Sequence, residues 1–307
     1  MIAYIFRRIM LIIPVVLGVT LVSFIILHSI PGDPAEVIAG LDGTKEVLER
    51  IRADLGLNKP LPVQYLIFIR NILIHGDLGY SYRTQRPVFQ ELKGRFINSL
   101  KLGVTAIILA ILIGLISGIL SAIRENSKLD RLFTVSSLIA LSTPTFWSGL
   151  LLVIFFSVYL GWFPAGGMAG IKSYILPAVT LGLPASAVIT RMVRTSLLEV
   201  LHENYIRTAK AKGLSPFTVV LRHALKNALI PTVTVIGLQF GWLLGGTVVV
   251  ETVFSWPGMG QLIITGILGR DYPMVQGAIV VLAFAFIFIN LIVDILYTYL
   301  DPRIQYE

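Results

Sequence analysis

The sequence predicts an all-α membrane protein with six transmembrane helices and both termini in the cytoplasm, and three observations support this fold class. Of its 307 residues, 55% are hydrophobic and only 14% are charged, whereas soluble domains carry about 25% charged residues. Six stretches approach the length of a membrane span, and basic residues gather in alternate connections between them. In water such a chain would expose large apolar patches, which a lipid bilayer would cover.

The six candidate spans are long apolar stretches, since about 20 such residues cross a hydrocarbon core roughly 30 Å thick. They cover residues 9–30, 102–123, 132–160, 173–190, 227–250 and 272–299. The first exceeds the usual signal-peptide core of about 7–15 residues, and no Ala-x-Ala site follows it, so we expect it to be retained. Four prolines within these spans or at their start predict bends: Pro144, Pro177, Pro184 and Pro231.

The orientation follows from lysine and arginine, which favour short cytoplasmic connections. Outside the long segment of residues 31–97, which also holds many acidic residues, most of them lie before the first span, after the second and after the fourth: Arg7, Arg8, Arg124, Lys128, Arg131, Arg191, Arg194, Arg207, Lys210, Lys212, Arg222 and Lys226. The short connections expected outside carry only Lys172 and Arg270. The net charge of +8 is therefore ascribed to the flanks of membrane spans and not to nucleic-acid binding.

Residues 31–97 form the main segment expected outside the membrane. Pro31-Gly-Asp-Pro34 should stop the first helix, and residues 44–56 read as a short amphipathic helix with a glycine stop. A second helix is predicted over 62–75, and a third should begin at Pro87 and lead into the second span. This segment could be a lid over the bundle, a surface that meets an outside partner, or both.

The connection between the fourth and fifth spans, residues 197–228, predicts a helix–turn–helix outside the membrane. Residues 197–212 have a helical composition, Gly213 suits the position just after a helix, and Ser215 with Pro216 suits the start of the next. Such a projecting turn could transmit a push from a partner protein. A basic helix resting on anionic headgroups explains the same pattern equally well.

The sequence lacks the motifs of an energy-converting or catalytic protein. A phosphate-binding loop needs a Gly-Lys pair, and none occurs in this chain. There is no cysteine, and the four histidines, at positions 28, 75, 202 and 223, make no His-x-x-x-His spacing. We therefore expect no enzyme, no metal site and no cofactor in this chain, and any drive by ATP must come from elsewhere.

Residues 205–214 resemble the coupling loop of bacterial ATP-binding-cassette importer permeases, which docks into the ATPase subunit. Gly213 falls on the central glycine of that loop, and Arg207-Thr-Ala209 falls on its Glu-Ala-Ala, with arginine in place of glutamate. The resemblance implies coupling roles for ten residues: Tyr205, Arg207, Thr208, Ala209, Lys210, Ala211, Lys212, Gly213, Leu214 and Ser215.

Other segments resemble the dipeptide/oligopeptide/nickel permease family in particular. Its markers occur in order along nearly the whole chain: Tyr205-Ile-Arg-Thr-Ala-Lys-Ala-Lys-Gly-Leu214, Arg222-His-Ala-Leu-Lys-Asn-Ala-Leu-Ile-Pro231, Pro31-Gly-Asp-Pro34, Gly76-Asp-Leu-Gly-Tyr-Ser81, Glu251-Thr-Val-Phe-Ser-Trp-Pro-Gly-Met-Gly260, Arg270-Asp-Tyr-Pro273 and Asp301-Pro-Arg303. The long first outside segment is similar to that of the B-type subunit of this family.

The resemblance implies a single permease domain, residues 1–307, in the bacterial cytoplasmic membrane that forms half of a translocation pathway for dipeptides or oligopeptides. Nickel chelates, glutathione and other small solutes are alternative substrates. The implied partners are a C-type permease, two ATPases that bind ATP and magnesium, and an extracytoplasmic substrate-binding protein. A secondary transporter would instead need charges near mid-membrane, for which only Asp294 is a candidate. A membrane scaffold would not need a projecting loop.

Candidates for the pathway or its gate come from the fifth span and the residues after it. Glycines at every fourth position allow close helix packing, either within one subunit or beside the pathway. Residues 253–271 should form a compact element that gates the outer mouth and helps receive the binding protein. The candidates are Gly237, Gly241, Gly245, Glu251, Trp256, Pro257 and Gly258. Asp294, in the sixth span, should face protein or water.

Overall fold

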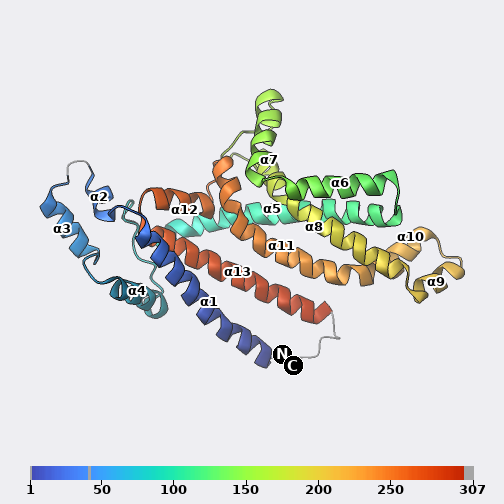
Figure 1. Cartoon of the computed structure of the whole chain (residues 1–307), viewed down its shortest axis with the longest axis horizontal. Coiled ribbons are helices and arrows are strands. Elements are labelled where there is room, and N and C mark those ends of the chain that lie inside the picture. Colours follow the sequence, from blue (N-terminus) through green and yellow to red (C-terminus); the bar gives the residue numbers. More distant parts are fainter. Residues whose placement is uncertain (1, 41–42, 301–307) are drawn as a thin grey trace. The chain divides into compact units, whose positions relative to one another are not determined.

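The computed structural model describes the backbone of residues 2–40 and 43–300 and the side chains of residues 13–40, 43–243 and 245–293. Helices and their connections make up this part of the chain (Figure 1), together with one isolated antiparallel bridge between Tyr80 and Pro87. The chain divides into two compact units. One unit comprises residues 1–99 and 257–287, and the other comprises residues 100–256 and 288–307.

Within the described residues, four helices are long and apolar enough to cross a membrane. They belong to α5 (Val88–Ile123), α8 (Ile175–Leu201), α11 (Leu225–Val253) and α13 (Tyr272–Leu300). A bent pair of helices raises the number to five if it counts as one span. The helix α1 (Ile2–Ser29) contains the first predicted span, but its described side chains begin at Ile13 and cover a shorter apolar stretch. The predicted number of six therefore stays a prediction.

The third predicted span, residues 132–160, is not one continuous helix. It consists of α6 (Lys128–Ser142) and α7 (Thr145–Leu152), which continues as the π-helix η3 (Val153–Tyr159). The two parts make an angle of 106° at the break between them, which Figure 1 shows clearly. Thr143 is extended there, with ψ 124°, because the ring of Pro144 disfavours helical geometry in the residue before it.

The unit of residues 1–99 and 257–287 contains α1, the short helices that follow it, and the connection between α11 and α13 from residue 257 onward. These helices are α2 (Pro34–Ala39), α3 (Lys45–Asp54), α4 (Leu61–Arg70), the π-helix η2 (Asn71–His75) and α12 (Met259–Leu268). Gly56 and Gly76 follow their helices with positive φ, at the ends of the two helices predicted over residues 44–56 and 62–75, and Thr44 caps α3. Asp33 caps α2 and forms an ion pair with Arg52 of α3.

The core of this unit forms around the N-terminal turns of α5 and α13. Val88 and Leu92 of α5 pack with Met259 of α12 and with Met274 and Ala278 of α13. Within the predicted element of residues 253–271, α12 forms a helix whose residue Leu262 is buried. This core joins segments from the two ends of the chain into one body.

In the unit of residues 100–256 and 288–307, α8 packs against both α6 and α11. Helices α5 and α8 approach closely at glycines: a Cβ on Gly114 would lie 2.6 Å from Ile189, and one on Gly118 would lie 2.7 Å from Val193. Such small residues allow membrane helices to pack backbone to backbone. Going from Gly114 to Gly118 along α5, the contacted residue moves from Ile189 to Val193 along α8, so the two helices run parallel. The bent pair α6–α7 therefore has to return the chain between them.

The predicted fourth span, residues 173–190, is shorter than the helix that contains it. The helix α8 continues to Leu201, so Arg191 and Arg194 belong to the helix and not to a connection. Pro184 and Pro231 lie inside α8 and α11 without breaking either helix. The prediction that residues 1–307 act as one permease domain stays a prediction.

Candidate functional site

The turn of residues 202–215 lies between two of the long helices and has the predicted helix–turn–helix form. After α8 ends, α9 (Asn204–Ala211) adds two turns of helix, and Gly213 follows with φ +77°. Ser215 caps α10 (Pro216–Thr218) by accepting a hydrogen bond from the backbone N–H of Thr218. α10 continues through the π-helical turn η5 (Val219–Ala224) into α11. Glycine is needed at position 213 because other residues rarely adopt this φ.

Buried contacts attach this turn to the helices on both sides of it. Ile206 and Ala209 of α9 are buried in a cluster that includes Val219 and Val220 of η5. The side-chain amide of Asn227, at the start of α11, donates a hydrogen bond of 2.8 Å to the hydroxyl of Tyr205. A force on the turn would therefore act on α11 through packed side chains as well as through the backbone.

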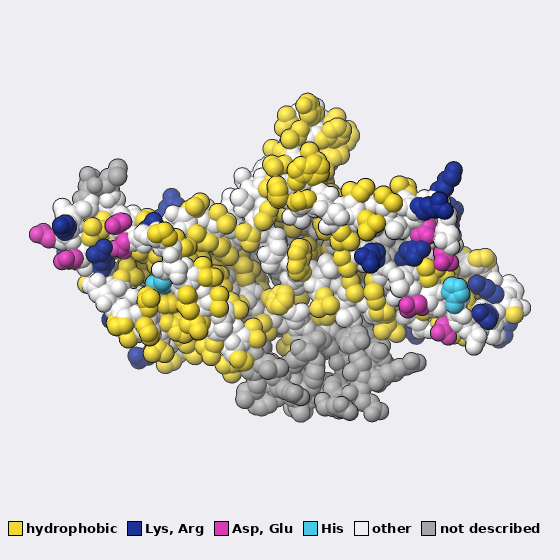
Figure 2. Space-filling model, in the orientation of Figure 1, with side chains coloured by type: hydrophobic (Ala, Val, Ile, Leu, Met, Phe, Trp, Pro, Cys, Tyr) yellow, Lys and Arg dark blue, Asp and Glu magenta, His cyan; other side chains and the backbone are white. Residues whose placement is uncertain are grey.

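The outward side of the turn carries the residues that the sequence analysis assigned to coupling. Arg207, Thr208 and residues 210–215 are exposed, whereas Ala209 is buried and acts in packing. Figure 2 shows basic side chains over this part of the chain. Two large apolar residues of the next turns are exposed as well, with 73% of Phe217 and 45% of Leu221 accessible. Exposed apolar side chains ringed by polar ones are typical of a protein interface.

A buried ion pair joins α6 and α8 close to this turn in the sequence. The guanidinium of Arg194 donates two hydrogen bonds to the carboxylate of Asp130, at 2.7 and 2.8 Å. Asp130 also accepts hydrogen bonds from the hydroxyl of Ser121 and the backbone N–H of Asn126. In the sequence Arg194 is one of several basic residues after the fourth predicted span, and no spacing distinguishes it from Arg191.

The pathway candidates lie in different surroundings. A Cβ on Gly237 would lie 2.4 Å from the side chain of Val293, so this glycine packs α11 against α13. Gly241 is buried, whereas Gly245 is exposed and has open space where a Cβ would lie. Of the three, only Gly245 presents a surface on which a second protein could pack closely.

The residues expected at the gate are largely buried. Glu251 and Trp256 are both fully buried, and the ring of Trp256 packs edge-on against Tyr174 with centroids 4.6 Å apart. Glu251 is therefore packed among protein side chains, and its role at the pathway stays a prediction. The carbonyl of Pro257 accepts a hydrogen bond from Asn98, and Gly258 precedes α12 with extended backbone. The side chain of Asp294 lies outside the described residues.

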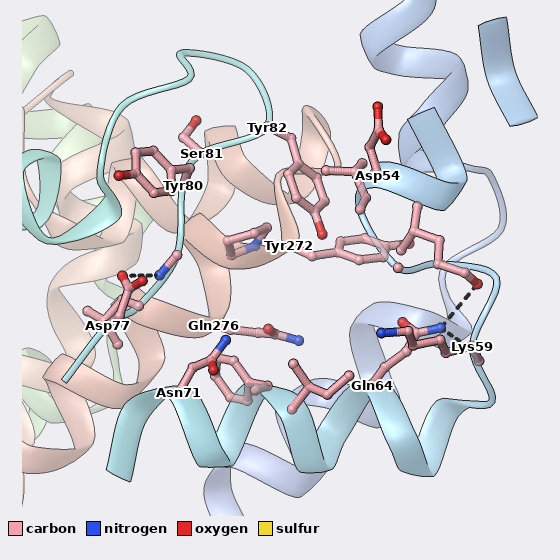
Figure 3. Close-up of a pocket in the computed structure, with 18 of the residues that line it drawn as sticks. Asp54, Lys59, Gln64, Asn71, Asp77, Tyr80, Ser81, Tyr82, Tyr272 and Gln276 are labelled. Carbon is pink, nitrogen blue, oxygen red and sulfur yellow. Dashed lines mark hydrogen bonds between the residues drawn. The ribbon is translucent and has the colours of Figure 1, made fainter. Parts of the chain in front are cut away.

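A cavity of about 460 Å³ opens in the unit of residues 1–99 and 257–287. Side chains from α1, α4, residues 77–85 and the start of α13 line it, as Figure 3 shows. No reading of the sequence had placed these segments together. Two of them, however, belong to the motifs Gly76–Ser81 and Arg270–Pro273 that carry the family resemblance.

The buried carboxylate of Asp271 holds these two motifs together. It accepts hydrogen bonds from the hydroxyl of Ser81, from the backbone N–H of Tyr82 at 3.0 Å, and from the N–H of Met274 in the first turn of α13. Burial raises the pKa of the neighbouring Tyr82 phenol to about 12, and the charge of Asp271 adds to this shift. Tyr82 is therefore protonated at any physiological pH.

The long apolar helices, with the turn of residues 202–215 between two of them, have the architecture of a multi-pass membrane protein. Residues 110–306 match the family described as the binding-protein-dependent transport system inner membrane component, and residues 1–103 match the N-terminal part of such membrane components. The chain belongs to this family, and it is a transport subunit of an ABC importer and not an enzyme.

Curated relatives agree with this assignment over the whole chain. The glutathione transport system permease protein GsiC of Escherichia coli K12 is 44% identical over 307 residues, with all of both chains covered. The protein of the same name from Pectobacterium atrosepticum is 46% identical over the same length.

Solved structures share the fold. An inward-facing MetNI methionine ABC transporter matches with a TM-score of 0.61 and 22% identity, over 69% of this chain and 97% of that one. An amino acid ABC transporter matches with a TM-score of 0.54 and 15% identity, over 70% and 95% of the two chains. At this identity the likeness concerns the fold alone.

Proposed function

We propose that this chain is the membrane subunit through which a bacterial ABC importer takes up short peptides, with the tripeptide glutathione as the first substrate to test. The observation that carries the proposal is the 44–46% identity, without gaps in coverage, to permeases named for glutathione transport. Dipeptides and longer oligopeptides share the amide groups and charged termini of glutathione, and they remain the next substrates in order.

In this proposal α1, α5, the bent pair α6–α7, α8, α11 and α13 are the six spans, and both termini are cytoplasmic. The parallel course of α5 and α8 supports one net crossing by the bent pair, because a re-entrant pair would leave α8 antiparallel to α5. The bond between Ser81 and Asp271 also supports it. These residues lie in the connections after α1 and after α11, which the six-span topology puts on the same, outer side.

The turn of residues 202–215 is then cytoplasmic and receives the ATPase subunit. Its support is the combination of basic residues, expected on that side, with the exposed side chains of Phe217 and Leu221. The chain itself needs no cofactor, since ATP and magnesium would bind the two partner ATPases. A C-type permease would complete the pathway, and an extracytoplasmic binding protein would deliver the substrate.

Uptake by the complete transporter tests the proposed function. The chain, its partner permease and the ATPases would be reconstituted in liposomes with the binding protein, and entry of labelled glutathione, dialanine and trialanine would be measured with and without ATP. We expect ATP-dependent entry of glutathione, which unlabelled tripeptides reduce by competition. Entry of none of the three peptides in vesicles that do hydrolyse ATP would contradict the proposal.

A further inference from the structure

The cavity of about 460 Å³ described above has the size of a small-molecule site, and none of its lining residues belongs to the turn of residues 202–215. One wall is aromatic: the ring of His28 stacks on Phe24 with centroids 4.0 Å apart and lies 4.9 Å from the ring of Tyr272. The ring of Tyr82 continues this wall, 6.4 Å from Tyr272. All of these residues belong to the same compact unit.

Several polar side chains of the cavity have no hydrogen-bond partner within the described part of the chain. They are the amides of Gln276 and Asn71 and the hydroxyls of Tyr82 and Tyr272. In Figure 3, Tyr82, Tyr272 and Gln276 reach toward the same space. Gln276 is the most informative of them, because only 5% of it is exposed. Its amide faces the cavity, where water or a ligand can supply the hydrogen bonds that the described residues do not.

The frame around these groups is held by hydrogen bonds of its own. The amide of Gln64 donates to the carbonyls of Leu57 and Lys59, at 3.2 and 2.8 Å, which fixes the connection between α3 and α4. Asp271 fixes the opposite side by holding Ser81 and Tyr82. Because the wall is already fixed, the protein loses less conformational entropy when a ligand binds, and the cavity is suited to bind without rearrangement.

The chemistry of the free groups indicates the class of ligand. Two amides and two phenols offer neutral donors and acceptors together, which match the N–H and C=O groups of peptide bonds. At the rim, the exposed side chains of Asp54, Asp77 and Lys59 carry both signs of charge and suit the termini of a zwitterion. Among the described residues no three His, Cys, Asp or Glu side chains gather as metal ligands would. The described lining also holds a single lysine or arginine side chain, Lys59, which provides less positive charge than a phosphate site normally does.

We propose that this cavity binds a short peptide of two or three residues, with Gln276, Tyr82 and Tyr272 hydrogen-bonding its amide groups. This inference rests on the proposed function, because it assigns the peptide a contact on the permease itself, between the end of α1, the start of α13 and the segment of residues 53–85. The raised pKa of Tyr82 agrees with it, since the phenol stays a hydrogen-bond donor throughout the physiological range. The site would hold a substrate before it enters the pathway.

Direct binding to the assembled transporter in lipid nanodiscs, without the binding protein, tests this site. Saturation-transfer NMR would be recorded with glutathione and trialanine as probes and with glucose as a non-peptide control. The variants are Gln276→Met, Tyr82→Phe and Tyr272→Phe, which remove polar groups and keep the side-chain size. Each loss of one hydrogen bond should raise the dissociation constant of both peptides about 3- to 10-fold.

Two matched variants control for the substitutions themselves. They are Gln90→Met and Tyr159→Phe. Gln90 is an exposed residue of α5, and Tyr159, in the other unit, is 77% exposed. Both should bind the peptides as the unaltered transporter does. Size-exclusion chromatography of the complex would show that each variant still assembles, and the two tyrosine variants provide the test if Gln276→Met does not.

The outcomes separate this inference from the proposed function. Absence of peptide binding, or equal binding by the cavity variants and the controls, overturns the site even if the liposomes import glutathione. Cavity variants that weaken only the attachment of the binding protein overturn it as well, because the cavity would then receive a protein segment and not a free peptide. Failure of import in the liposomes counts against the proposed function, whatever the NMR measures.

Discussion

The carboxylate of Asp271 accepts a hydrogen bond from the hydroxyl of Ser81, which lies 190 positions earlier in the chain. The same carboxylate accepts from the N–H of Tyr82 and caps α13 through Met274. It therefore fixes a loop and a helix start at once, and it places Tyr82 and Tyr272 on one side of the cavity. Two motifs that are far apart in the sequence thus form a single local structure.

Replacing Asp271 with alanine should destabilise this unit. The change removes a helix cap, worth about 1 kcal/mol, and leaves the O–H of Ser81 and the N–H of Tyr82 without their acceptor, at about 1–3 kcal/mol. We expect the free energy of unfolding, measured by denaturant titration in micelles, to fall by about 2–4 kcal/mol. Asp54→Ala, at an exposed carboxylate at the end of α3, is the control and should change it little. Equal effects of the two variants would contradict the role assigned to Asp271.

The ion pair between Asp130 and Arg194 predicts a non-additive pair of mutations. Arg194→Met would leave the buried carboxylate of Asp130 uncompensated, which typically costs about 3–5 kcal/mol. The double variant Asp130→Asn/Arg194→Met should be less destabilised, because it removes the stranded charge. Arg191→Met, on the exposed side of the same helix, should have almost no effect. If the loss of thermal stability in the double variant equals the sum of the losses in Asp130→Asn and Arg194→Met alone, the two residues are not coupled.

The effect of replacing Gly213 should depend on whether the new residue can adopt a positive φ, and not on the volume of its side chain. A Cβ there would meet nothing within 4 Å, but the φ of +77° disfavours other residues by about 1–2 kcal/mol. We expect Gly213→Val to reduce stimulation of the ATPase by loaded binding protein, whereas Gly213→Asn, which tolerates this conformation better, should retain most of it. Full coupling in the valine variant would show that the turn does not transmit the push.

Phe217 should contribute to the attachment of the ATPase. It is 73% exposed beside Leu214 and Leu221, and aromatic side chains buried at interfaces often contribute about 2 kcal/mol or more. Phe217→Ser should therefore weaken ATPase association at least about 10-fold in a pull-down titration. Phe89→Ser, at a phenylalanine 61% exposed in the other unit, serves as the comparison. Undiminished association of the Phe217 variant would place the docking surface elsewhere.

The local features of the fold were predictable because they depend on a few neighbouring residues. Glycine with positive φ ends helices at positions 56, 76 and 213, and Thr44 and Ser215 cap the helices that follow them. The short helices of the segment between the first two spans follow from the same signals. Each of these features is decided by backbone conformation within a single turn, so the residue type alone carries the information.

Other features were missed because they involve partners far apart in the chain. The close approach of Gly114 and Gly118 to α8 depends on which helix lies opposite, and hydropathy does not contain that information. The 106° break at Thr143 and Pro144 was expected only as a bend. The burial of Glu251 could not be distinguished from an interfacial position, because a helix end reads the same in both cases.

The sequence by itself determined that this protein spans the membrane several times, since apolar stretches and basic connections are local properties of the chain, and its motifs carried the resemblance to importer permeases. Only the tertiary structure decided that Asp130 binds Arg194, that Asp271 binds Ser81, and that Gln276 faces a cavity beside two tyrosines. The physical reason is that hydrogen bonds and ion pairs depend on atomic distances of about 3 Å, and such distances between remote residues exist only after the helices have packed.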